Sequence, residues 1–236
     1  MHYLPILSTL VTLVFAVAVF NRYRTRRGAH LLLWTVGLVF YGLGTAMEML
    51  MLFTFHPLAL KLWYLAGAML TAAWLGQGSL NLLVRRRGIA PVSNIILAVI
   101  SLVALGLTLA APVNSAVAFN TGLPASAQYK EILTRSGGMI ALTIILNIYG
   151  TITLVGGAIY SAFLFWRKKV LINRMFGNIL IAGGALLPAL GGSFLKAGLP
   201  DWLYLSELLG VILMYAGFLQ ATAIQPVQVT EPAAAD

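Results

Sequence analysis

Cysteine is absent from this sequence, and charged residues are scarce. A chain without cysteine forms neither a disulfide framework nor a thiolate metal site. Charged residues are 9% of the 236 residues, whereas a soluble domain carries roughly 25%. This shortage argues against a soluble enzyme, a nucleic-acid-binding protein and a disordered protein.

The residues and motifs of common catalytic centres are also missing. The histidines are His2, His30 and His56, and of these only His30 approaches the interior of an apolar segment. The sequence contains no HExxH, GxSxG or P-loop motif, and its last apolar segment has no lysine to carry retinal. We therefore predict a protein that is not an enzyme and that holds neither a metal ion nor a cofactor.

Hydrophobic residues, in contrast, make up 60% of the chain, and its mean hydropathy is +0.92. A helix needs about 20 apolar residues to cross a bilayer, and it satisfies its own backbone hydrogen bonds in lipid. We predict an all-α integral membrane protein whose single domain, residues 1–224, is a bundle of seven transmembrane helices, followed by a disordered tail over residues 225–236. The apolar segments are Leu4–Phe20, Ala29–Phe53, Leu58–Val84, Ile89–Val113, Gly138–Trp166, Arg174–Leu195 and Trp202–Ala223.

Basic residues are unevenly distributed among the connections between these segments. Eleven of the 15 lysines and arginines lie in or beside the connections that follow the first, third and fifth segments, and four lie elsewhere. By the positive-inside rule, those three connections face the cytoplasm, so the N-terminus lies outside and the C-terminus inside. The first basic cluster follows its apolar segment, which is typical of a retained anchor and not of a cleaved signal peptide. We predict a multi-pass protein of the inner (plasma) membrane.

Four charged residues are predicted to lie at one depth, near the outer end of the bundle. Glu48 and Glu207 fall within the second and seventh segments, while Lys61 and Lys196 lie at the matching ends of the third and sixth. Because a charged group inside a membrane is costly, we expect both carboxylates to face the interior and at least one to pair with a lysine. Such a cluster is either a clamp between helices or an outward-facing site for a ligand or ion.

Several neutral polar residues are expected to face the bundle interior, either as packing contacts that share hydrogen bonds or as the lining of a solute path. Pro188 lies among glycines in GGALLPALGG and is predicted to bend the sixth segment, because proline removes a backbone donor. Such a bend is either a hinge or a feature of packing. The interior polar residues are Gln77, Asn81, Asn147, Asn178 and Tyr215.

The connection Asn114–Gly137 is the exception among otherwise short connections, and it is predicted to lie outside. Its second half, Ser126–Arg135, is either an ordinary loop or a short helix at the membrane surface.

The stretch LLLWTVGLVFYGLGTAMEMLMLF, followed by LALKLWYLAGAMLTAAWL, resembles the second and third helices of the seven-helix sensor region at the N-terminus of some bacterial membrane histidine kinases. Trp34, Glu48 and the lysine–aromatic start at Lys61, Trp63 and Tyr64 carry this resemblance. In those kinases a cytoplasmic catalytic domain follows the helices, and this sequence holds the helices without it. The resemblance therefore implies a detached, sensor-like module.

Two functions from different classes follow from these observations. The first is a non-enzymatic sensor or accessory protein that passes an outer-face or lipid signal to a cytoplasmic signalling partner. The alternative is a small-solute or ion transporter, in which helices one to three and five to seven form a repeat around the fourth. The expected partners are the lipid bilayer, a cytoplasmic signalling protein and a small-molecule ligand, and not a nucleic acid.

Overall fold

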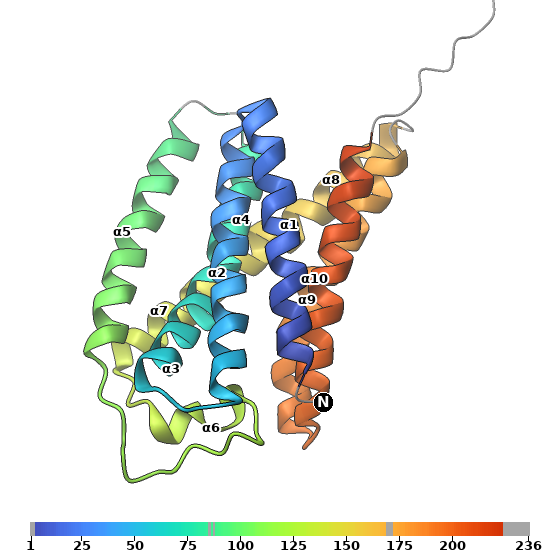
Figure 1. The fold of residues 1–236 in the computed structure, drawn as a ribbon. Coiled ribbons are helices and arrows are strands. Elements are labelled where there is room, and N and C mark those ends of the chain that lie inside the picture. Colours follow the sequence, from blue (N-terminus) through green and yellow to red (C-terminus); the bar gives the residue numbers. More distant parts are fainter. Residues whose placement is uncertain (1–2, 85, 87, 169–171, 224–236) are drawn as a thin grey trace, which may run out of the picture.

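The computed structural model describes residues 3–84, 86, 88–168 and 172–223, and the described part is built from helices, of which the spans consecutive in the chain run in opposite directions while the first and last spans run side by side in the same direction (Figure 1). Seven helical spans are long and apolar enough to cross a membrane, which confirms the predicted number. They are α1 (Leu4–Arg26), α2 (Ala29–Met51), α3 (Pro57–Trp63) continued by η1 (Tyr64–Leu70) and α4 (Thr71–Leu83), α5 (Ile89–Ala110), α7 (Gly137–Thr151) continued by η2 (Ile152–Gly156) and α8 (Gly157–Lys168), α9 (Ile172–Lys196) and α10 (Pro200–Thr222).

The ends of α1, α4, α8 and α10 lie together at one end of the bundle (Figure 1). At this end Arg22 Nη2 donates a hydrogen bond of 3.2 Å to the carbonyl of Thr222, which joins the last turns of α1 and α10. The basic residues of the α1–α2 turn and of the last turn of α8 therefore share one side of the molecule. The assignment of this side to the cytoplasm stays a prediction.

The described part of the long connection contains a short helix, α6 (Ala125–Ile132), at the opposite end of the bundle (Figure 1). Of the two alternatives for Ser126–Arg135, the helix is thus the correct one. Its flanks are fastened by a single pair of antiparallel residues, Val113 and Leu133.

Two spans contain a wider, π-helical turn, η1 and η2. Such a turn shifts the backbone register and leaves carbonyl groups for other partners. In η1 these carbonyls are used, because Thr71 Oγ1 donates to the carbonyl of Ala66 at 2.8 Å and Asn147 Nδ2 donates to that of Ala68 at 2.7 Å. Asn147 thereby fixes α7 against η1.

Glycine allows three pairs of helix backbones to approach closely. A Cβ atom on Gly44 of α2 would lie 2.8 Å from the Cα atom of Gly67 in η1, and one on Gly150 of α7 would lie 2.3 Å from the backbone carbon of Ala72. A Cβ atom on Gly184 of α9 would lie 2.6 Å from the carbonyl oxygen of Gly210 in α10. Helices in lipid associate through such contacts, because no hydrophobic driving force brings them together.

Helix α9 is continuous through Pro188. Because proline has no N–H, the carbonyl of Gly184 lacks its usual intrahelical partner, and the proline ring packs against Gly210 of α10. The predicted bend at Pro188 stays a prediction, while the proline is placed at the α9–α10 contact.

Helix α5 is the least buried of the seven membrane-length helices. A row of polar contacts attaches it to the neighbouring span: Trp74 Nε1 donates to Ser101 Oγ at 3.1 Å, and Gln77 Nε2 donates to Asn94 Oδ1 at 2.6 Å. Asn81 Nδ2 donates to the same Asn94 oxygen at 2.8 Å. Polar side chains therefore hold this helix where little apolar surface is buried.

The predicted interior polar residues are distributed over several helix contacts. Gln77 and Asn81 join α4 to α5, and Asn147 joins α7 to η1. Asn178 Nδ2 donates to Ser161 Oγ at 3.3 Å between α9 and α8, and the Tyr215 ring packs 5.1 Å from that of Phe15 between α10 and α1. Their positions favour the packing interpretation over a single continuous solute path.

Candidate functional site

A cavity of about 380 Å³ lies between the helices, beside α6. This volume falls within the range of about 300–1,000 Å³ that is typical of small-molecule sites. Five spans and α6 contribute its walls. Residues that line it include Tyr41, Thr45 and Glu48 of α2, Trp63 of α3, Thr71 and Leu75 of α4, Ser126 and Tyr129 of α6, Asn147 and Thr151 of α7, Pro188 of α9, and Leu203 and Glu207 of α10.

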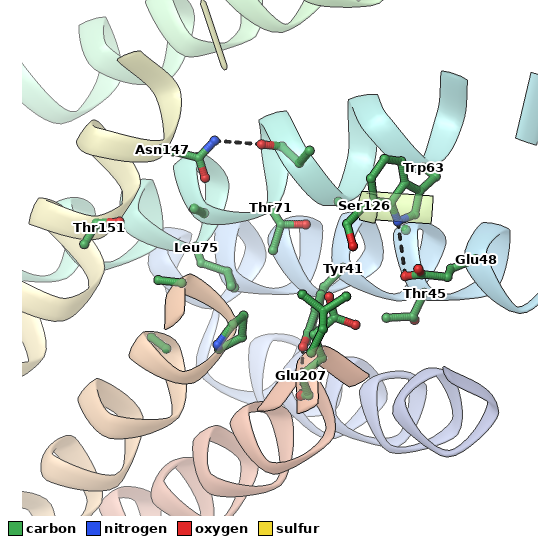
Figure 2. A pocket seen from close by; sticks show the side chains of 18 of the residues that line it. Tyr41, Thr45, Glu48, Trp63, Thr71, Leu75, Ser126, Asn147, Thr151 and Glu207 are labelled. Carbon is green, nitrogen blue, oxygen red and sulfur yellow. Dashed lines mark hydrogen bonds between the residues drawn. The ribbon is translucent and has the colours of Figure 1, made fainter. Parts of the chain in front are cut away.

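Glu48 lies at the end of this cavity nearest to α6, and it is 3% exposed. Its Oε2 atom accepts a hydrogen bond of 3.2 Å from the indole Nε1 of Trp63 (Figure 2), and its Oε1 atom accepts one of 3.2 Å from the backbone N–H of Ala125. Tyr204 of α10 interacts with the same carboxylate. Glu48 thus connects α2, α3, α6 and α10, and its buried oxygens are satisfied.

Glu207 lines the same cavity from α10. Figure 2 shows the side chain of Tyr41 reaching toward it, and the Tyr41 hydroxyl donates a hydrogen bond of 2.9 Å to the backbone carbonyl of Glu207. Within the part of the chain that the structure describes, the Glu207 carboxylate itself has neither a hydrogen bond nor an ion pair. Glu48 and Glu207 line the same cavity from α2 and α10. The two acidic residues therefore belong to one site, but of the two carboxylates only that of Glu48 has partners in the part of the chain that the structure describes.

Among the described residues Lys61 forms no ion pair with Glu48 or Glu207, so the expected pairing of a carboxylate with Lys61 or Lys196 stays a prediction. The Lys61 ammonium donates a hydrogen bond of 2.7 Å to the carbonyl of Leu109 at the end of α5. Lys61 and Trp63 are two residues apart, so their side chains leave the helix about 200° apart. Since Trp63 points to Glu48, Lys61 points to the opposite side. The side chain of Lys196, the other predicted partner, lies outside the described residues.

Helix α6 covers the cavity at the end where Glu48 lies. The Tyr129 ring packs 5.5 Å from the rings of both Trp63 and Tyr64, and the Arg135 guanidinium lies 4.9 Å from the Tyr129 centroid. Burial raises the pKa of the Tyr129 phenol, and the positive charge of Arg135 opposes that rise. These contacts place α6 as a lid whose inner face is aromatic.

Ser126 in the first turn of α6 lines the cavity, and its buried hydroxyl oxygen has no hydrogen-bond partner within the described ranges of the chain. Buried polar atoms are nearly always hydrogen-bonded. Together with the Glu207 carboxylate, Ser126 gives the cavity acceptor groups that no described residue uses.

The sequence pointed to both carboxylates but missed most of their surroundings. Trp63 was detectable as a partner of Glu48, since it lies at the same depth of the next span. Tyr41, two turns before Glu48 on α2, and Ser126, in the distant connection, carry no comparable sequence signal. Among the residues that the structure describes, no group of three or more histidine, aspartate or glutamate side chains is arranged to hold a metal ion.

Comparisons of this chain with protein-family models, with curated proteins and with solved structures found no match.

Proposed function

We propose that this protein is a non-enzymatic, multi-pass protein of the bacterial inner membrane that binds a small molecule in the central cavity and passes the signal to a cytoplasmic partner. The observation that carries the proposal is the cavity beside α6, whose walls hold the hydrogen-bonded carboxylate of Glu48 and the carboxylate of Glu207, which has no partner among the residues that the structure describes. In a clamp both carboxylates would be satisfied, whereas a binding site needs groups left for the ligand.

A signal has a physical route out of this site. A ligand that contacts Glu207 acts directly on α10, whose last turn is joined to α1 by the Arg22–Thr222 hydrogen bond. The basic α1–α2 turn beside that bond is the surface we propose for the cytoplasmic partner. The coupling requires only that α10 shift relative to α1 when the cavity is filled.

Transport is the second candidate, and the position of Pro188 favours it. This proline lies in the cavity wall, where α9 has lost one backbone hydrogen bond. A hinge beside a membrane-embedded site is a recurring feature of transporters. The two candidates differ in whether the bound molecule crosses the membrane.

The deciding experiment begins with a thermal-shift screen of a metabolite library against the full chain in nanodiscs. Each stabilising compound is then tested on a variant with a filled cavity, Ala185→Phe, and on a matched lipid-facing variant, Leu190→Phe. We expect stabilisation to disappear in Ala185→Phe and to persist in Leu190→Phe.

The same compounds are then offered to sealed proteoliposomes in a radiolabelled uptake assay. Binding without accumulation supports the sensor, and accumulation that is saturable supports the transporter. If no compound stabilises the protein in a cavity-dependent way, both proposals are wrong.

A further inference from the structure

We infer that the ligand of the central cavity is a small organic ammonium ion, held by the Glu207 carboxylate and the aromatic wall of Trp63 and Tyr41. This inference rests on the proposed ligand-binding function and names the chemical class of the ligand. It starts from the unpaired state of Glu207 within the described part of the chain.

The charge balance of the cavity calls for a cation. Two carboxylates line it, and the lining contains no lysine, arginine or histidine among the described residues. Lys61 is engaged with Leu109 on the far side of its helix, and Arg135 lies over Tyr129 without belonging to the lining. A positively charged ligand would supply the countercharge that the described walls lack, and opposite charges attract more strongly in such a site than in water.

The walls favour an organic cation over a metal ion. Metal ions such as Ca²⁺ and Mg²⁺ require about six or more oxygen ligands in tight geometry, and no cluster of three or more ligating side chains exists in the described residues. The cavity instead presents Trp63, Tyr129 and Tyr41, whose ring faces attract ammonium groups. Its volume of about 380 Å³ suits a molecule of several heavy atoms and is far larger than one dehydrated metal ion.

The positions of the polar groups give the ligand an orientation. Lining acceptors without a partner among the described residues include the Glu207 carboxylate and the Ser126 hydroxyl, while the Glu48 oxygens already accept from Trp63 and Ala125. The remaining lining includes Leu75, Leu154, Leu203 and Met214, which are apolar. An ammonium head beside Glu207 with a short aliphatic body against these side chains fits both parts of the cavity.

The test measures binding of three ammonium probes, tetramethylammonium, choline and n-butylammonium, to the full chain in nanodiscs by thermal shift and isothermal titration. The control ligand is 3,3-dimethylbutan-1-ol, which has the shape of choline without its charge. We expect at least one ammonium probe to bind and the neutral control to bind at least about tenfold more weakly.

Three variants separate charge recognition from folding. Glu207→Gln removes the charge and is expected to weaken binding at least about tenfold, whereas Glu207→Asp keeps the charge and retains binding. Glu131→Gln removes an exposed carboxylate of α6 and leaves binding unchanged. Circular dichroism of each variant without ligand shows whether it is folded. If Glu207→Gln does not fold, binding to Glu207→Asp is the measurement that tests the inference.

The inference is overturned if the neutral control binds as tightly as the tightest-binding ammonium probe, or if no ammonium probe binds. In either case, cavity-dependent binding of a neutral or anionic compound in the library screen would leave the proposed function standing. If the screen also yields no cavity-dependent ligand, the proposed function falls together with the inference.

Discussion

Trp63 and Glu48 lie in consecutive spans, and the indole N–H of Trp63 donates to the carboxylate of Glu48 across the contact between α3 and α2. The bond is buried, and the same carboxylate receives the first backbone N–H of α6. Helix α6, the second span (α2) and the start of the third span (α3) therefore meet at the side chain of Glu48.

Replacing Trp63 by phenylalanine keeps an aromatic ring and removes the donor. Because a buried carboxylate then loses one of its hydrogen bonds, we expect the free energy of unfolding to fall by about 1–3 kcal/mol. Reversible unfolding in mixed micelles measures this change. Trp166→Phe, at a side chain that is 65% exposed, serves as the control and should change it by less than about 0.5 kcal/mol. Equal effects of the two variants would mean that the Trp63–Glu48 bond contributes nothing to stability.

Gly150→Ala should separate α7 from α4. The added methyl group would overlap the backbone of Ala72, which cannot move as a flexible side chain can. We expect destabilisation of about 1–3 kcal/mol, seen as a lower melting temperature in nanodiscs.

The matched variant is Gly106→Ala in α5, where no atom lies within 4 Å of the added methyl group. Here alanine should raise stability by up to about 1 kcal/mol, since it favours a helix over glycine. Destabilisation by both substitutions would contradict the close approach of α7 and α4.

Asn94→Leu should loosen α5. The substitution removes the acceptor of both Gln77 and Asn81 and leaves their amide groups with fewer partners. We expect a loss of about 1–3 kcal/mol and a broader distance distribution between spin labels at positions 82 and 103. Ile95→Leu, at a side chain that is 65% exposed, should leave both measurements unchanged, and a broad distribution in that control would assign the motion to the labels.

The orientation of the bundle can be tested with single cysteines, because the natural chain has none. We expect a cysteine at Thr121, in the connection before α6, to react with a membrane-impermeant thiol reagent in intact cells. A cysteine at Arg24 should react only after permeabilisation. The reverse pattern would place α6 and the cavity end on the cytoplasmic side.

The spans were predictable because each depends on local composition. The segment predicted at Ala29–Phe53 corresponds to α2 at Ala29–Met51, and that at Trp202–Ala223 lies within one or two residues of α10. Only the ends of the spans differ from the prediction, because charged and aromatic residues lie at the membrane interface. The first helix, for example, continues to Arg26, past the Phe20 at which the predicted apolar segment ends.

The cavity was not predictable, because its walls depend on the relative rotation of helices. Depth along the membrane suggested Lys61 or Lys196 as the partner of a carboxylate, but depth does not give the face from which a side chain leaves its helix. The second partner, the N–H of Ala125, comes from a connection 77 residues away. The π-helical turn η1 also changes the direction in which Gly67 and Ala68 face, and no residue pattern predicts such a turn.

The span formed by α7, η2 and α8 has 32 residues and is about 48 Å long, well beyond the roughly 30 Å of a hydrocarbon core. It crosses the bundle obliquely, with α7 next to α5 and η1 and with α8 next to α9 (Figure 1). Its wider turn, η2, lies near the middle, where the span contacts α4 and α9. A rotation of this span about η2 would move α7 and α8 in opposite directions. The flank that holds α5 and the flank that holds α9 are therefore mechanically linked through one continuous element.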